Sequence, residues 1–157
     1  MVVAIDIDPA RLELARQFGA TEVFDPRGAG AEERVAELKG RGFDTVVDCS
    51  GAQAGLDLAT RLTPRGGRLN LFGWNHGQAA FAGDAWHLGG FTVVNSSPSS
   101  RLRDPFPAAI RLIDKGVFAL DRLVTHVVGL DEYGDLMEKV SAGEEPGYIK
   151  GVVRLEE

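Results

Sequence analysis

The chain has 157 residues, 44% of them hydrophobic and 25% charged, a balance typical of a globular domain with its own core. Its net charge of -6 argues against a nucleic-acid surface, and its apolar runs fall short of the roughly 20 residues that span a membrane. The acidic charge leaves a cytoplasmic, small-molecule setting as the expectation, and the single cysteine, Cys49, which cannot form an internal disulfide, fits a reducing compartment.

The first predicted elements are a buried strand and a helix. Residues 2–5 form an apolar run that ends at Asp6, and Asp8 and Pro9 then open a segment with helical periodicity. Asp8 is a good N-cap, and Pro9 suits the first helical position because its missing N–H would be unpaired there anyway. Gly19 tolerates the left-handed conformation that ends a helix. The opening of the chain therefore predicts a strand followed directly by a helix.

Strands and helices continue to alternate along the chain. We expect strands at residues 20–24, 43–47, 68–72, 91–94, 123–128 and 148–155, and helices at residues 32–39, 52–62, 84–88, 104–115 and 131–141. This spacing is typical of parallel βαβ units in a doubly wound α/β sheet. The polar residues 96–100 mark the predicted boundary between a partial domain at residues 1–94 and a small α+β segment at residues 95–157.

Asp6 is the principal candidate for binding. An acid at the carboxyl end of a parallel strand lies where open α/β sheets bind ligands, and there it can accept both hydroxyls of an adenosine ribose. In dinucleotide-binding folds this acid follows the glycine-rich turn G-x-G-x-x-G by roughly 20 residues. That turn does not precede Asp6 in this sequence, so we interpret the chain as a Rossmann domain entered at its second strand, part of a longer enzyme.

The missing first strand has a predictable effect on the sheet. In the strand order 3-2-1-4-5-6, its loss opens a gap between the strand at residues 2–5 and the strand at residues 43–47. Unpaired backbone on both sides of the gap is expected to make the isolated chain marginally stable and prone to association.

Several stretches together carry a resemblance to a known family. They are AIDIDPARLELARQFGA at residues 4–20, GFDTVVDCSG at 42–51, LTPRGGRLNLFG at 62–73, LVTH at 123–126 and YIKGVV at 148–153. In order and with matching gaps, they resemble the carboxyl-terminal half of medium-chain dehydrogenases/reductases, and they are similar to the zinc-type alcohol and polyol dehydrogenases in particular. The resemblance implies hydride transfer between an alcohol or polyol and nicotinamide, with the zinc ligands and proton relay outside this chain. It therefore implies neither a catalytic residue nor a metal ligand here.

The resemblance also assigns cofactor roles by position. Asp6 matches the acid that binds the adenosine ribose, and because it would repel a 2′-phosphate it favours NAD over NADP. Arg11 matches a basic residue beside the same ribose. The other matched positions are Cys49, Ser50 and Gly51 along the adenine, Phe72, Gly73 and Trp74 at the nicotinamide, Thr92 and Val94 at its carboxamide, and Lys150 near the pyrophosphate.

Simpler interpretations stand beside these roles. Asp6 is alternatively a strand-end acid satisfied by a neighbouring helix, and Arg11 and Lys150 are alternatively solvated surface residues. Cys49 is interpreted as a small packed hydrophobe, because no nearby histidine activates it. The histidines have no Cys or Glu at a zinc-site interval; they are His76, His87 and His126.

Three functions remain open from the sequence. The first is the cofactor-binding half of an NAD-dependent zinc-type alcohol or polyol dehydrogenase, inactive as this chain alone. The second is a non-catalytic Rossmann-like module that binds a nucleotide or a partner. The third is a zinc-free NADPH enone reductase of the same superfamily, against which Asp6 argues. The resemblance further implies a homodimer or homotetramer joined through residues 74–94, and neither nucleic acid nor a membrane is an expected partner.

Overall fold

The computed structural model describes residues 1–96 and 104–155. The chain divides into two compact units, Met1–Arg101 and Leu102–Glu157, which are described separately. Most of the polar loop at residues 96–100 lies outside the described residues, and the domain boundary after residue 94 stays a prediction. No helix in the described ranges is long and apolar enough to cross a membrane.

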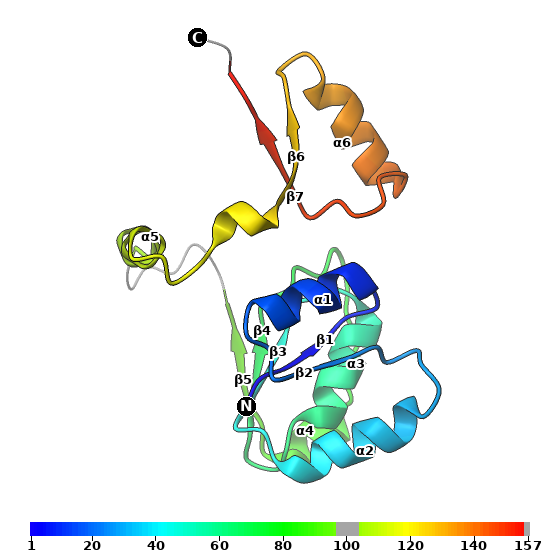
Figure 1. Ribbon diagram of the computed structural model, residues 1–157. Helices are drawn as coiled ribbons and strands as arrows, with labels where there is room; N and C mark the ends of the chain where they lie inside the picture. Colours follow the sequence, from blue (N-terminus) through cyan, green and yellow to red (C-terminus); the bar gives the residue numbers. More distant parts are fainter. Residues whose placement is uncertain (97–103, 156–157) are drawn as a thin grey trace. The chain divides into compact units, whose positions relative to one another are not determined.

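The first unit alternates strands and helices (Figure 1). Its strands are β1 Val3–Ile5, β2 Glu22–Phe24, β3 Thr45–Asp48, β4 Arg68–Leu71 and β5 Thr92–Asn95. Its helices are α1 Pro9–Gln17, α2 Ala31–Arg41, α3 Gln53–Leu62 and α4 Gly83–Gly89. Each falls within a few residues of its predicted place, because period-2 and period-3.6 patterns identify elements better than they identify their ends.

The strands form two separate parallel sheets. β1 pairs with β2, and β3, β4 and β5 form a second sheet in that order. This is the strand order of a doubly wound sheet from which the central first strand is missing. The predicted incomplete Rossmann-type parallel sheet is therefore confirmed, together with the break between β1 and β3.

One hydrophobic core joins the two sheets. Val35 and Leu38 of α2 and Leu62 of α3 are buried together, with Leu38 fully buried. Residues of both sheets pack against them, together with Phe43 just before β3 and Leu58 of α3; the sheet residues are Val3, Ile5, Phe24 and Val46. Figure 1 shows α1 and α2 on opposite sides of β1 and β2. The sheets thus stay in one unit because the helix layer continues beneath both of them.

A second cluster supports β4. Leu56 and Ala59 of α3 pack with the fully buried Leu69, and Trp86 of α4 lies against this cluster. The Nε1–H of Trp86 donates to Thr60 Oγ1 at 3.0 Å, so the indole is both packed and hydrogen-bonded. Helices α3 and α4 are thereby fixed on the sheet that ends at the candidate site.

Helix α1 begins and ends as the sequence predicts. The Oδ1 atom of Asp8 accepts a hydrogen bond from the N–H of Ala10 at 2.8 Å, and Pro9 lies in the first turn. Gly19 follows the helix with a φ of 95°, a left-handed conformation that favours glycine. The N-cap fixes the connection between β1 and α1, and Asp6 lies in this connection.

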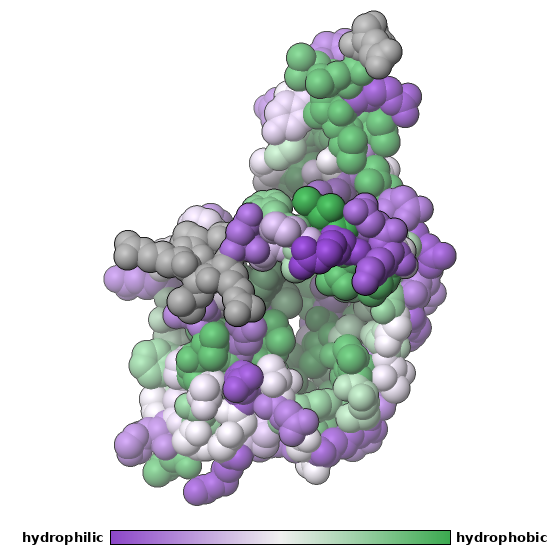
Figure 2. All heavy atoms as spheres, turned by 90° about the vertical axis from the view of Figure 1, so that its left-hand side faces the viewer, coloured by the Kyte–Doolittle hydropathy of each residue, from purple (hydrophilic) through white to green (hydrophobic). Residues whose placement is uncertain are grey.

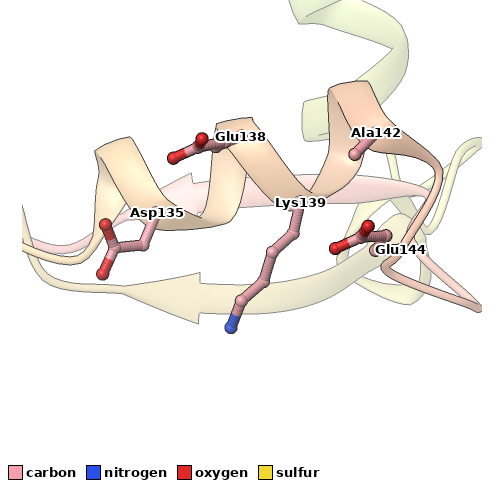
Figure 3. A pocket seen from close by; sticks show the side chains of 5 residues that line it. All are labelled: Asp135, Glu138, Lys139, Ala142 and Glu144. Atoms are coloured by element: carbon pink, nitrogen blue, oxygen red, sulfur yellow. The ribbon is translucent and has the colours of Figure 1, made fainter.

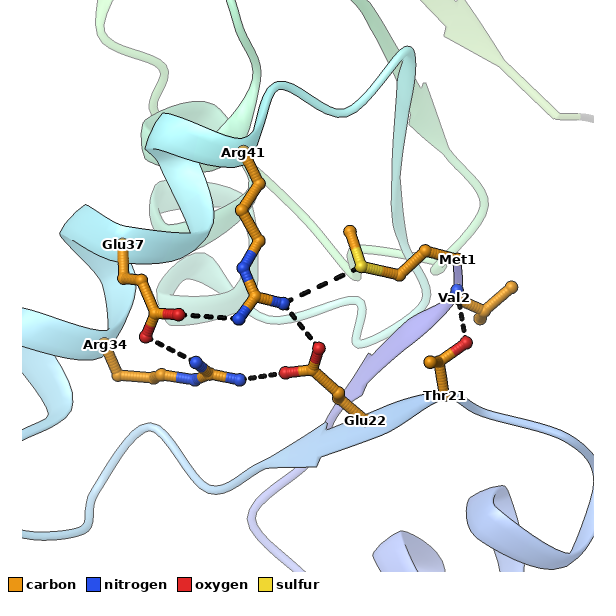
Figure 4. Close-up of polar contacts among 7 residues, drawn as sticks. All are labelled: Met1, Val2, Thr21, Glu22, Arg34, Glu37 and Arg41. Carbon is orange, nitrogen blue, oxygen red and sulfur yellow. Dashed lines mark hydrogen bonds and ion pairs between the residues drawn. The ribbon is translucent and has the colours of Figure 1, made fainter.

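A ring of ion pairs attaches α2 to β2 (Figure 4). Arg34 and Arg41 of α2 each contact both Glu22 of β2 and Glu37 of α2, with 2.6 Å between Arg41 Nη2 and Glu37 Oε1. The four side chains alternate in charge, so each carboxylate is held by two guanidinium groups. The ring orients α2 over β2 and reinforces the apolar contacts of Val35 and Leu38.

The second unit is built around a parallel strand pair. It contains helix α5 Phe106–Asp114, the 3-10 helix η1 Leu120–Leu123, β6 Val124–Val128, α6 Tyr133–Ala142 and β7 Lys150–Val153. β6 and β7 are parallel, with α6 as their crossover. The sequence did not predict η1, because four residues carry too little periodicity to distinguish a 3-10 turn from a loop.

The ion-pair ring predicts stability that decreases in acid. Hydrogen bonds from Arg41 and Arg34 hold the pKa of Glu22 below its ordinary value, and the same two arginines lower the pKa of Glu37. The stabilisation is complete above the unfolded-state pKa of about 4.3 and is lost as the pH falls through the lowered native pKa. Glu22→Gln should therefore lower the melting temperature at about pH 7 and lose its effect near pH 2, below both pKa values.

Thermal unfolding over this pH range tests the expectation. Glu33→Gln is the matched control, because Glu33 lies on α2 but outside the ring of ion pairs. An equal effect of Glu22→Gln at both pH extremes would mean that the ring contributes through packing and not through charge.

Candidate functional site

The carboxyl ends of β3 and β4 lie side by side. Asp48, the last residue of β3, is in register with Leu71, the last residue of β4. The segments that follow, residues 49–51 and residues 72–74, therefore leave the sheet at the same edge. Open α/β sheets bind ligands at this edge, and the structure brings six of the predicted site residues together here.

The two segments are locked together by close backbone contact. The N–H groups of Phe72 and Gly73 both donate to the carbonyl oxygen of Asp48, at 2.9 and 2.7 Å. A Cβ atom on Gly73 would lie 2.3 Å from the backbone nitrogen of Gly51, and a Cβ on Gly51 would lie 2.5 Å from the carbonyl oxygen of Trp74. Both positions need glycine because backbone, which cannot move aside, occupies that space. The paired segments form a rigid ledge at the end of the sheet.

Asp48 is a site residue whose structural role the sequence analysis missed. Its side chain is buried, and its Oδ1 atom accepts hydrogen bonds from the N–H of Ser50 at 2.9 Å and from the Ser50 hydroxyl at 2.6 Å. The Ser50 hydroxyl in turn accepts from the N–H of Ala52 at 3.1 Å, immediately before α3. An acid two residues before a serine at a strand end is the available sequence signal for such a turn. Asp48 thus holds residue 50 of the ledge in place through these hydrogen bonds.

The other oxygen of Asp48 has no hydrogen-bond partner. Its Oδ2 atom is buried and unpaired within the described residues. An unsatisfied buried polar atom costs on the order of 1–3 kcal/mol, so such atoms are rare in native structures. The unpaired oxygen therefore lowers the stability of this strand end.

Asp6 directly follows β1 and is half-buried. Its Oδ1 atom accepts a hydrogen bond from the N–H of Asp8 at 2.9 Å, and it forms no ion pair with any residue that the structure describes. A carboxylate accepts about four hydrogen bonds, so with one accepted from Asp8, capacity remains for about three further donors. The geometry fits a ligand with adjacent hydroxyl groups.

A cation lies beside this acid. Arg27 donates to the carbonyl oxygen of Ile7 and to Asp25 Oδ2 at 3.2 Å. The carboxylate of Asp25 chiefly raises the pKa of Arg27, with smaller contributions from Asp6 and Asp8. Sequence reasoning missed Arg27 because it comes from the loop after β2, and only the β1–β2 pairing places it next to the end of β1.

Arg11 lies on the first turns of α1 and points elsewhere. Its Nε atom is 3.7 Å from Asp8 Oδ2, and its side chain is 54% exposed. The observed ion pair joins Arg11 to the N-cap and not to Asp6. Its predicted role beside the ribose stays a prediction.

Cys49 is exposed at the end of β3. Partial burial of its sulfur, and then the negative charge of Asp48, raise the pKa of the thiol. The raised pKa argues against a reactive thiolate. Because the side chain is exposed, the prediction that Cys49 is a packed hydrophobe is wrong: the residue lies beyond the end of β3, where no helix of the described ranges covers it. Two aromatic side chains lie exposed on the neighbouring segment: Phe72, and Trp74, whose ring stacks on His76 with 5.6 Å between centroids.

Two predicted residues lie on β5, one toward each end of the strand. Thr92 begins β5 in register with Arg68, the first residue of β4, and its N–H donates to the carbonyl oxygen of Gly67 at 2.9 Å. Val94 lies two residues further along and is exposed. The structure does not bring Thr92 to the carboxyl edge, and the carboxamide roles of both residues stay predictions.

Lys150 belongs to the second unit. It begins β7 with an exposed side chain, and its N–H donates to Thr125 Oγ1 at 3.3 Å. The Thr125 hydroxyl also accepts from the N–H of Ile149 at 3.0 Å, which holds the start of β7 at a register shift in β6. Its role at a pyrophosphate stays a prediction.

A shallow hollow on α6 offers no comparable chemistry. The residues lining it are Asp135, Glu138, Lys139, Ala142 and Glu144, and Figure 3 shows their charged groups pointing in different directions. All five are exposed, as expected for a solvated helix face. No group of three or more potential metal ligands occurs in the part of the chain that the structure describes.

Over the described residues, the fold and the strand-end ledge define a Rossmann-type α/β domain of the dehydrogenase class, in which no strand pairs between β1 and β3. The sequence matches the model of the zinc-binding dehydrogenase family over residues 1–115. The chain belongs to this family.

Individual relatives agree with this assignment. The chain is 30% identical over 149 residues to a probable D-xylulose reductase A of Arthroderma otae, an alignment that covers 91% of this chain and 41% of the relative. It is 30% identical over 133 residues to an alcohol dehydrogenase of Cupriavidus necator, covering 83% of this chain and 36% of the relative. The crystal structure of an alcohol dehydrogenase zinc-binding domain protein from Burkholderia ambifaria matches all of this chain and 42% of its own, with 26% identity and a TM-score of 0.80. The chain thus spans about two fifths of these relatives.

The ledge predicts a specific sensitivity to added volume. Gly73→Ala should cost about 1–3 kcal/mol of unfolding free energy, because its Cβ would overlap backbone that cannot relax. Gly40→Ala is the control: Gly40 lies in α2 with open space around its Cβ position, so alanine there should stabilise by about 0.5–1 kcal/mol. Urea unfolding measures both changes. Equal stability of Gly73→Ala and wild type would contradict the locked ledge.

Proposed function

We propose that this chain is the NAD-binding half of a zinc-type alcohol or polyol dehydrogenase, an enzyme that transfers hydride between an alcohol and nicotinamide. The observation that carries the proposal is the half-buried carboxylate of Asp6 at the carboxyl end of β1, which has hydrogen-bonding capacity left for ribose hydroxyls. Family membership supports the reaction class. The names of the relatives support a small alcohol or polyol as substrate.

In this proposal the chain positions the cofactor. Asp6 accepts the two hydroxyls of the adenosine ribose, and the ledge of residues 49–51 and 72–74 supports the remainder of the dinucleotide. The rigidity of the ledge matters because hydride transfer requires the donor and acceptor carbons to be held near van der Waals contact. In the full enzyme a zinc ion would supply Lewis-acid chemistry at the alcohol oxygen, and the proposal assigns no zinc ligand to this chain.

The choice of NAD over NADP rests on local charge. The Asp6 carboxylate would repel a 2′-phosphate at the ribose it binds. Arg27 is the nearby cation that could favour such a phosphate, but its guanidinium is engaged by Asp25 and by the carbonyl oxygen of Ile7. The net arrangement at the end of β1 therefore favours the unphosphorylated ribose.

Residues 74–94 are the expected subunit interface. We expect the complete enzyme to be a cytoplasmic homodimer or homotetramer joined through residues 74–94. The exposed apolar side chains in this region support an interface; they are Trp74, Phe81, Leu88, Val93 and Val94.

Titration of NAD against the purified chain tests the ribose role. Asp6→Asn should weaken NAD binding by about 10- to 100-fold, because it removes charge-assisted hydrogen bonds worth about 1.5–3 kcal/mol. Asp44→Asn, the same change just before the amino end of β3, should leave affinity unchanged. Calorimetry or nicotinamide fluorescence measures both variants. Equal affinity of Asp6→Asn and wild type would favour the non-catalytic module with a structural acid.

A turnover assay tests whether this chain alone lacks dehydrogenase activity. The purified chain, supplied with NAD, zinc and a panel of polyols, should produce no NADH above background, because the metal ligands and proton relay are assigned elsewhere. Absorbance at the nicotinamide band measures the product. Clear turnover would refute the assignment of this chain as a cofactor-binding half.

A further inference from the structure

The ends of β1 and β2 bring two acids to adjacent positions. Ile5 pairs in register with Phe24, and the next residue along the chain is Asp6 after β1 and Asp25 after β2. The N–H of Asp6 still donates to the carbonyl oxygen of Phe24 at 3.3 Å, so the two backbones stay adjacent at this point. Because like charges at neighbouring positions of paired strands are destabilising, a cation is expected beside these acids.

Arg27 is that cation, and its guanidinium is held in a fixed position. Its Nε atom lies 3.2 Å from Asp25 Oδ1, and its Nη2 atom lies 3.2 Å from Asp25 Oδ2. This bidentate pair matches the planar fork of the guanidinium. Nη2 also donates to the carbonyl oxygen of Ile7, the residue after Asp6. The guanidinium therefore links the end of β2 to the residue that follows the candidate ribose acid.

The turn after β2 fixes Asp25 as well as Arg27. The Oδ1 atom of Asp25 accepts a hydrogen bond from the N–H of Arg27 at 2.9 Å, a local turn that aspartate favours. The hydrogen bonds from Arg27 hold the pKa of Asp25 below its ordinary value, so this carboxylate stays ionised at neutral pH. The side chain of Arg27 is 60% exposed, and a dissolved anion could otherwise reach it. Asp25 thus acts as an internal anion on the fork.

Carboxylates surround Arg27 on more than one side. Asp25 chiefly raises the pKa of Arg27, and Asp6 and Asp8 add smaller contributions, so all three carboxylates act on the same cation. Figure 2 shows that hydrophobic side chains are also exposed on one face of the first unit. The groups that contact Arg27, however, are a carboxylate and a carbonyl oxygen. Charge therefore decides which ligand can bind to this arginine.

We propose that Asp25 is a specificity-determining residue, which excludes the 2′-phosphate of NADP by occupying the guanidinium fork of Arg27. This inference rests on the proposed function, because it takes the adenosine ribose to be bound by Asp6. A 2′-phosphate on that ribose would lie at the end of β1, where Arg27 contacts Ile7. Phosphate and carboxylate bind the same fork in the same bidentate way, so they compete for it.

The donor count of Arg27 shows why Asp25 blocks the fork. Nε carries one N–H group and Nη2 carries two, and these three are engaged by Asp25 and by the carbonyl oxygen of Ile7. A phosphate could then reach only Nη1, and a single nitrogen cannot give a bidentate pair across two nitrogens. Neutralising Asp25 releases this side of the guanidinium to a phosphate.

Asp6 and Asp25 exclude a 2′-phosphate in different ways. Asp6 repels the phosphate by charge at the ribose itself, whereas Asp25 acts through Arg27. The effect of Asp25 should therefore disappear when Arg27 is replaced, and the effect of Asp6 should not. An acid that served only the turn after β2 would change the affinity for phosphorylated and unphosphorylated ribose together.

NMR titration of the purified chain with two nucleotides tests the proposal. The probes are 2′,5′-ADP, which carries the 2′-phosphate, and 5′-AMP, which has the same ribose without it. Wild type should bind 5′-AMP more tightly. Asp25→Asn should tighten 2′,5′-ADP binding by about tenfold and change 5′-AMP binding by less than about twofold, because one charge-assisted pair is exchanged for another. Asparagine keeps the side-chain oxygen that accepts the N–H of Arg27, so the turn is preserved.

Matched variants separate the role of the fork from net charge and from folding. Combining Asp25→Asn with Arg27→Gln should remove the gain, because the phosphate then has no fork to bind. Asp44→Asn removes the same charge just before the amino end of β3 and should change neither affinity. Asp25→Ser is a second neutral variant whose hydroxyl can form the same turn. The melting temperature of each variant reports whether it is folded.

Three results would overturn the proposal. The first is unchanged 2′,5′-ADP affinity in both neutral variants while wild type binds 5′-AMP, which would leave the ribose role of Asp6 intact. The second is a gain that survives Arg27→Gln, which would assign the effect to net charge. The third is tight binding of 2′,5′-ADP by wild type, which would mean that Asp25 does not block the fork. Failure of wild type to bind 5′-AMP would instead contradict the proposed function, and this inference with it.

Discussion

The structure depends on the apolar contact that α2 and α3 make across a broken sheet. Val35, Leu38 and Leu62 pack against residues of both β1 and β3, although these strands are not hydrogen-bonded to each other. Hydrophobic burial is non-directional, so a helix layer can hold two sheets together where the backbone ladder is interrupted. This contact keeps both sheets in one unit, although one edge of β1 and one edge of β3 have no paired strand in the described ranges.

The ledge at the ends of β3 and β4 illustrates a different kind of constraint. Its geometry is enforced by hydrogen bonds to the Asp48 carbonyl and by the absence of side chains at Gly51 and Gly73. Beneath it, the buried carboxylate of Asp48 turns the chain through Ser50 into α3. Such an arrangement can hold a ligand rigidly. The ledge offers backbone groups and aromatic side chains. This fits a part of an enzyme that orients a cofactor and leaves bond-making to other residues.

Charge distinguishes the two ends of the candidate site. At the end of β1 the acids Asp6 and Asp8 lie near Arg27, whose guanidinium already donates to Asp25 and to the carbonyl oxygen of Ile7. At the end of β3 the carboxylate of Asp48 is buried and raises the pKa of the neighbouring Cys49 thiol, after the effect of burial. The carboxylates of the candidate site therefore lie at strand ends. The arginines of α2 take part in a structural ring of ion pairs with Glu22 and Glu37.

The sequence alone determined the α-helices and strands, the parallel sheet with its missing strand, the family, and the place of Asp6 after the first strand. These follow from local periodicity, capping residues and ordered motifs, all of which are encoded by neighbours in the chain. Only the tertiary structure revealed the unsatisfied oxygen of Asp48, the ion pair that draws Arg11 to Asp8, the approach of Arg27 to the end of β1, and the position of Thr92 at the amino end of β5. Each of these depends on strand register or on contacts between segments distant in sequence, and a one-residue difference in register reverses which side of a strand a group faces.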